Sequence, residues 1–63
     1  MNATEMKEID AKYREARDSN DRARMEICHA AGRLLKRTGN SGKWREAYAS
    51  PPADFTADML EES

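Results

Sequence analysis

The chain has little of the material that small proteins use to reinforce a fold. Its 63 residues include one cysteine, Cys28, and one histidine, His29. A single cysteine excludes a disulfide within the chain, and a cysteine next to a histidine lacks the spacing of a structural zinc site. A chain this short buries only about 60% of its unfolded surface. The sequence therefore favours oligomerisation as the remaining source of stability.

Long apolar runs are missing as well. No segment approaches the roughly 20 apolar residues that span a bilayer, and residues 1–10 are too polar and acidic for a signal peptide. Charged residues make up 37% of the chain, yet the net charge is only −1. This balance is typical of a solvated helical surface rather than of a disordered tail. We expect a cytoplasmic protein with a reduced thiol and no membrane partner.

Proline and glycine are scarce, and their positions outline the first helix. Residues 3–37 contain no proline and a single glycine, and they are rich in good helix formers. Gly39 follows as a left-handed C-terminal stop. The spacing predicts one long N-terminal helix over residues 3–37.

The rest of the chain predicts shorter elements. Ser41 can cap a helix over residues 42–49, which the proline pair at 51–52 stops. Asp54 can cap a last element over residues 54–62, either a short helix or a mobile acidic tail. The fold class predicted is all-α, with residues 1–63 as a single small helical domain.

Within the long helix, apolar and small residues recur at alternating spacings of three and four. This heptad spacing predicts a seam that another helix must cover. Its members are Met6, Ile9, Tyr13, Ala16, Asn20, Ala23, Ile27, Ala30 and Leu34.

Charge and size favour an antiparallel partner for this seam. A parallel pair would bring Lys12 against Arg17 of the other helix. An antiparallel pair centred on Asp18 matches large side chains with small ones and opposite charges on the flanks. The predicted core pairs are Ile9–Ile27, Tyr13–Ala23, Met6–Ala30 and Ala16–Asn20, and the flank pairs are Asp10–Arg24 and Lys12–Glu26.

The same pairs can form between two chains or within one. The segment 18–21 is four poor helix formers in a row. If it turns, the chain forms a helical hairpin. If it stays helical, as the spacing of Asp18 and Arg22 favours, two long helices form a homodimer. The two arrangements are related by a domain swap, and we predict the continuous helix with the hairpin as the alternative.

No group of residues assembles a catalytic, metal or cofactor site. Cys28 and His29 are neighbours on a helix, so their side chains point about 100° apart and cannot act as a nucleophile and base. There is no phosphate-binding glycine loop and no catalytic serine motif. We therefore expect a protein that is not an enzyme and needs no cofactor or metal.

Basic residues gather in the middle of the chain. Residues 22–45 hold seven bases and one acid, whereas residues 46–63 hold five acids and no base. The bases are candidate contacts for a partner or for phosphates: Arg22, Arg24, Arg33, Lys36, Arg37, Lys43 and Arg45. They make nucleic acid an alternative partner, although the acidic overall charge opposes it.

Three of the four aromatic residues of the chain lie near the C-terminus, together with a methionine. The set is Trp44, Tyr48, Phe55 and Met59. We predict that it packs as a cap on the long helix near Leu34 and Leu35. An exposed partner-binding patch is the alternative, because tryptophan and tyrosine are common anchors.

Two stretches resemble a known group of proteins. Asp10-Ala11-Lys12-Tyr13-Arg14-Glu15-Ala16-Arg17 and Gly39-Asn40-Ser41-Gly42-Lys43-Trp44 resemble small early proteins of lambdoid temperate phages, encoded between the exonuclease and excisionase genes. The resemblance implies a helical accessory protein that influences the choice between lysis and lysogeny through host or phage proteins. It assigns no role to a particular residue.

Overall fold

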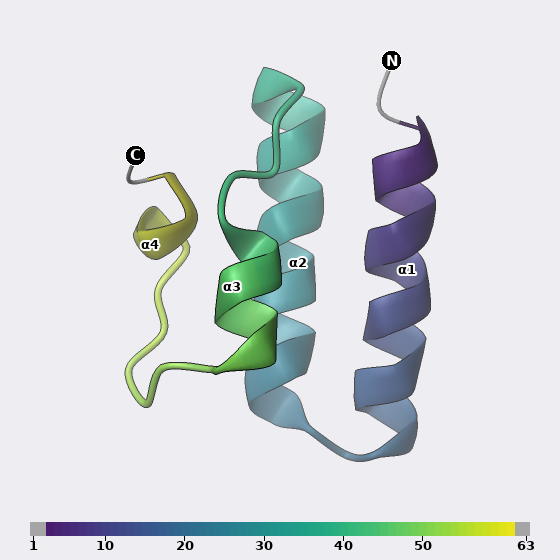
Figure 1. Cartoon of the computed structure of the whole chain (residues 1–63), viewed down its shortest axis with the longest axis vertical. Helices are drawn as coiled ribbons and strands as arrows, with labels where there is room; N and C mark the ends of the chain where they lie inside the picture. Colours follow the sequence, from purple (N-terminus) through teal and green to yellow (C-terminus); the bar gives the residue numbers. More distant parts are fainter. Residues whose placement is uncertain (1–2, 62–63) are drawn as a thin grey trace.

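The computed structural model describes residues 3–61, and this range contains helices and connecting segments but no strand. The helices are α1 (Ala3–Asp18), α2 (Arg22–Thr38), α3 (Trp44–Ala49) and α4 (Asp58–Glu61). Figure 1 shows α1 and α2 side by side and antiparallel, joined by a short corner. The all-α fold class is confirmed.

The chain turns between Asp18 and Arg22, so the hairpin is the arrangement observed. The prediction of one helix over 3–37 is wrong for this structure, and the alternative break near 18–21 is confirmed. The four poor helix formers outweigh the single charge pair that favoured continuity, because a pair of this kind stabilises a helix by only about 0.2–0.5 kcal/mol.

Asparagine, rather than glycine, makes this corner possible. The N–H of Asn20 donates to the carbonyl of Arg17, and the N–H of Asp21 donates to the carbonyl of Ala16 (2.8 Å). These two bonds form a Schellman ending, with Asn20 in the left-handed region at φ 58°. Asparagine tolerates this region better than other residues with a Cβ, so α1 ends without a glycine.

The residue after this ending also begins the next helix. Asp21 is the N-cap of α2, and its side chain accepts a hydrogen bond from the backbone N–H of Arg24. The guanidinium of Arg24 bonds the other carboxylate oxygen of Asp21 at 2.7 Å. This bond holds the pKa of Asp21 below its ordinary value. One residue therefore closes α1 and opens α2, which keeps the corner short.

The register of the hairpin differs from the predicted one. Tyr13 was expected opposite Ala23, but its ring packs edge-on against the ring of His29, with centroids 4.9 Å apart. The predicted flank pairs Asp10–Arg24 and Lys12–Glu26 are replaced by the local pairs Asp21–Arg24 and Lys12–Glu15. The turn lies around Asn20 rather than Asp18, so Tyr13 meets a later residue of α2 than predicted.

Most of the predicted seam packs inside this one chain. Ile9, Ala16, Ile27 and Leu34 are buried, Met6, Tyr13 and Ala30 are partly buried, and Asn20 and Ala23 are exposed. The core continues through Cys28, Ala31, Leu35, Trp44 and Leu60. Asn20 and Ala23 leave the seam because the corner turns them into solvent.

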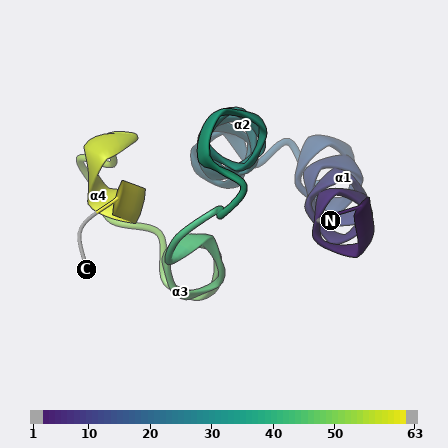
Figure 2. The same ribbon diagram turned by 90° about the horizontal axis from the view of Figure 1, so that it is seen from above.

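α2 is the central helix of the molecule. Figure 2 shows α1 on one side of α2, α4 on the other, and α3 against a third side. The helix ends as predicted at Gly39, which has φ 83° and donates its N–H to the carbonyl of Leu35. One side of α2 therefore stays uncovered by the other helices.

The predicted cap of α3 has another role. Ser41 was expected to begin a helix over 42–49, but α3 begins at Trp44 and the residue before it makes no side-chain cap. Ser41 is instead fully buried, and its hydroxyl donates to the carboxylate of Glu5. A buried hydroxyl needs such a partner, so Ser41 ties the loop after α2 to the first turn of α1.

The last helix also starts later than predicted. Asp54 does not begin a helix, since α4 spans only Asp58–Glu61, and the predicted end at residue 62 lies outside the described residues. Leu60 anchors this segment in the core, with 2% of its surface exposed. Its carbonyl accepts a hydrogen bond from the N–H of Lys43.

Two arginines fasten α3 to the hairpin. Arg24 donates from Nε to the carbonyl of Tyr48 at 2.7 Å, close to the C-terminal end of α3. Arg45 forms a two-pronged ion pair with Glu8 of α1, with a shortest distance of 2.6 Å. The Arg45 bond lowers the pKa of Glu8. These contacts explain how a helix as short as α3 holds its place.

Candidate functional site

Two grooves border the uncovered side of α2. The first, here the α1–α2 groove, has a volume of about 370 Å³ and no lining residue from α3 or α4. Its apolar wall consists of Met6, Ile9, Tyr13 and Cys28. Gly32 also lines it, and a Cβ at this position would meet nothing within 4 Å. The missing side chain keeps the groove open along α2.

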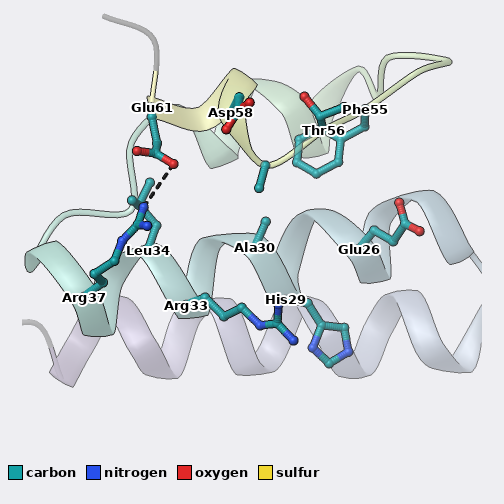
Figure 3. Close-up of a pocket in the computed structure, with 11 residues that line it drawn as sticks. Glu26, His29, Ala30, Arg33, Leu34, Arg37, Phe55, Thr56, Asp58 and Glu61 are labelled. Carbon is teal, nitrogen blue, oxygen red and sulfur yellow. Dashed lines mark ion pairs between the residues drawn. The ribbon is translucent and has the colours of Figure 1, made fainter.

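The second groove lies between α2 and the C-terminal segment. This C-terminal groove has a volume of about 590 Å³. Figure 3 shows Phe55 and Thr56 lying across from Ala30 of α2. At one end of this groove, Arg37 and Glu61 form an ion pair at 3.0 Å. Acidic Glu26 and Asp58 also line it, so its charge is mixed.

A basic ridge separates the two grooves. We give this name to His29, Arg33, Lys36 and Arg37, which are all exposed on α2. His29 and Arg33 line both grooves, while Lys36 lines the α1–α2 groove. Among the described residues, neither Arg33 nor Lys36 has an ion-pair partner within 4.0 Å. These two cations are therefore available to an outside group.

The structure divides the seven predicted basic residues into two groups. Arg24, Arg37 and Arg45 are held in ion pairs within the chain. The others, Arg22, Arg33, Lys36 and Lys43, form no ion pair with the described residues. Arg33 and Lys36 lie on the basic ridge, whereas Lys43 lies in the loop before α3. The predicted stretch is thus not one continuous contact surface.

The aromatic set is divided in a similar way. Trp44 is 1% exposed and belongs to the core. Tyr48 packs edge-on against it, and the hydroxyl of Tyr48 donates to the carbonyl of Lys12 at 3.1 Å. Phe55 is half-buried in the C-terminal groove, and Met59 is 37% exposed. Trp44 therefore forms part of the cap, whereas Phe55 and Met59 offer apolar surface.

The Cys28 and His29 side chains are placed apart, as their helical positions require. Cys28 is 2% exposed, while His29 is exposed and contacts the Tyr13 ring. Burial raises the pKa of the Cys28 thiol from 9.0 to about 11, which disfavours the reactive thiolate. Among residues 3–61, no group of three or more histidine, cysteine, aspartate or glutamate side chains could hold a metal ion.

The Cys28 thiol should make stability depend on alkaline pH. Because its folded pKa is raised, the folded state holds the proton more tightly, so stability is full below pH 9 and falls as the pH rises towards 11. We expect a loss of roughly 2 to 3 kcal/mol across this range, since the pKa shift is about two units and one unit is about 1.4 kcal/mol. Urea unfolding of the wild type and of Cys28→Ala across this range measures the difference in slope.

Tyr48 supplies the control for that experiment. Burial raises its pKa too, so the Tyr48→Phe variant removes a second contribution of the same sign. If Cys28→Ala shows the same loss of stability above pH 9 as the wild type, the effect belongs to Tyr48 or to other groups.

The sequence pattern predicts the seam, but it does not predict the groove that packing of this seam within one chain leaves on the open side of α2. The signal for it is Gly32, which interrupts the row of side chains on α2 next to Arg33.

No helix in residues 3–61 combines the length and the apolar character that a membrane crossing needs. Comparisons with protein families, with curated proteins and with solved structures find no match to this chain.

Proposed function

We propose that this chain is a non-enzymatic interaction protein that binds an acidic amphipathic helix of a partner protein in the α1–α2 groove. The observation that supports the proposal is a groove with an apolar wall and two cations, Arg33 and Lys36, that have no ion-pair partner among the described residues and outnumber its one carboxylate, Asp10. An amphipathic helix lays its apolar face into a groove of this kind, and acidic residues beside that face would meet the cations.

The resemblance to small early phage proteins suggests where the partner comes from. We propose a host or phage protein, and a regulatory role in the choice between lysis and lysogeny. Nucleic acid is the weaker alternative. Three of the seven predicted cations form ion pairs with acidic residues of the same chain. In addition, the net charge of −1 gives no general attraction to phosphates.

The test is capture from a nuclease-treated bacterial lysate by three immobilised proteins: the wild type, a face variant and a charge-matched control. The face variant carries Arg33→Glu and Lys36→Glu, and the control carries Arg14→Glu and Arg17→Glu on the exposed side of α1. We expect a protein that the wild type and the control retain and the face variant loses.

The captured protein is then purified and titrated by calorimetry. The face variant should bind at least tenfold more weakly than the control, which corresponds to about 1.4 kcal/mol. Equal binding of both variants contradicts the proposed groove. Retention that occurs only in a parallel lysate left without nuclease, with steep salt dependence, instead supports the nucleic-acid alternative.

A further inference from the structure

We propose that the α1–α2 interface also accepts α1 from a second copy of the chain, so that two chains exchange α1 and the corner Ser19–Asp21 straightens into helix. The dimer would be antiparallel, with the hairpin's own contacts made between chains. This inference does not depend on the partner proposed above. It concerns the interior of the hairpin and not its outer groove.

The corner is held by few and local contacts. Its backbone N–H groups donate to carbonyls in the last turn of α1, and the carbonyl of Asp21 accepts from the N–H of Met25 in the first turn of α2. Asn20 is the one residue other than glycine, among those described, with a positive φ. Straightening the corner therefore breaks local bonds and relieves a sparsely populated backbone conformation, while the core of the hairpin is not itself part of the hinge.

The two helices keep their inward sides aligned when the corner becomes helical. In an α-helix each residue turns by about 100°. On that basis the buried residues Ile9, Ala16, Ile27 and Ala31 fall within about 60° of one another on a continuous helix. A straight chain from α1 to α2 would thus present one apolar side, which a second straight chain could cover.

Every long-range contact of α1 can also be made by a second copy. The bonds Glu5–Ser41, Glu8–Arg45 and Lys12–Tyr48 all link α1 to residues beyond the corner. None involves the corner residues themselves. Exchange of α1 therefore preserves these bonds and the core, and its cost is confined to the corner and to the loss of freedom when two chains associate.

The composition of the corner sets the balance towards the hairpin. Ser19, Asn20 and Asp21 are poor helix formers, and Asp21 loses its capping bonds if the corner straightens. A variant with alanine at all three positions removes these preferences. Sedimentation should then show a dimer dissociation constant at least tenfold lower than that of the wild type.

A matched substitution at one position gives the opposite result. Asn20→Gly favours the left-handed turn and should raise the dimer dissociation constant, whereas Asn20→Ala should lower it. This pair carries the test if the triple alanine variant fails to fold. Equal dissociation constants for Asn20→Ala and Asn20→Gly, or no dimer for any variant at millimolar concentration, overturn the proposal.

The exchange is distinguished from a side-by-side dimer by the contact between Tyr13 and His29, whose ring centroids lie 4.9 Å apart in the hairpin. Labelled and unlabelled chains are unfolded, mixed and refolded, and isotope-filtered nuclear Overhauser spectra are recorded on the dimer. Exchange predicts this contact between chains. Its detection only within chains means that the dimer forms through another surface, which contradicts the proposal.

Discussion

Replacing Gly42 with alanine is expected to destabilise the protein by about 3 kcal/mol or more, through a steric clash and an unfavourable backbone conformation together. A Cβ at this position would lie 2.0 Å from the carbonyl oxygen of Leu60, and Gly42 has φ 66°. The clash is with backbone, so no side-chain rotation relieves it. Guanidinium unfolding followed by circular dichroism measures the loss.

Gly32 is the matched control for this prediction. It lies inside α2, where a Cβ would meet nothing within 4 Å. Gly32→Ala should therefore stabilise the protein by about 0.5–1 kcal/mol, because glycine is the poorer helix former. The two glycine substitutions are expected to have opposite signs. A small effect of Gly42→Ala would mean that the Leu60 backbone does not lie against this loop.

The close approach at Gly42 has a structural role. It allows the N–H of Lys43 to donate to the carbonyl of Leu60, while the side chain of Leu60 enters the core. Gly42→Ala should thus release the C-terminal segment before it unfolds the hairpin. Hydrogen exchange of the variant and the wild type should then show that the substitution accelerates exchange at Leu60 and Met59 more than in the middle of α2.

Local signals in the sequence were sufficient for the helical class and for the end of α2. The lysine and arginine before Gly39, and the glycine itself, identify that end without any tertiary information. The corner between α1 and α2 was harder to place, because its decisive residue is Asn20. Asparagine is a poor helix former, yet it occurs in helices as well as in caps and left-handed turns, so its role depends on whether the two helices can pack.

Positions whose role depends on distant residues could not be read from local patterns. Ser41 is a residue type that caps helices and precedes a predicted helix, yet its hydroxyl bonds Glu5 near the other end of the chain. Arg24 and Arg45 belong to a basic stretch, yet they bind Tyr48 and Glu8 in the fold. Charge counting along the sequence cannot separate cations that fasten helices from cations that face outward. Only the three-dimensional packing makes that distinction.

Trp44→Ala should have the largest effect among the large side chains, about 3–5 kcal/mol of lost stability. Trp44 is 1% exposed, stacks edge-on with Tyr48 and lies beneath the guanidinium of Arg45. A chain of this size has little more stability than that to lose, so the variant should be largely unfolded. Circular dichroism during thermal and guanidinium unfolding measures the change without relying on tryptophan fluorescence.

Two other substitutions separate packing from binding as the role of this residue. The Trp44 Nε1 atom is buried and has no hydrogen-bond acceptor among the described residues. Trp44→Phe removes this group and keeps most of the ring, so it should cost only about 1 kcal/mol, well below alanine. Met59→Ala, at a position 37% exposed, should change stability by less than about 0.5 kcal/mol. A folded, stable Trp44→Ala protein that has lost its partner would instead identify Trp44 as a binding anchor and contradict its place in the core.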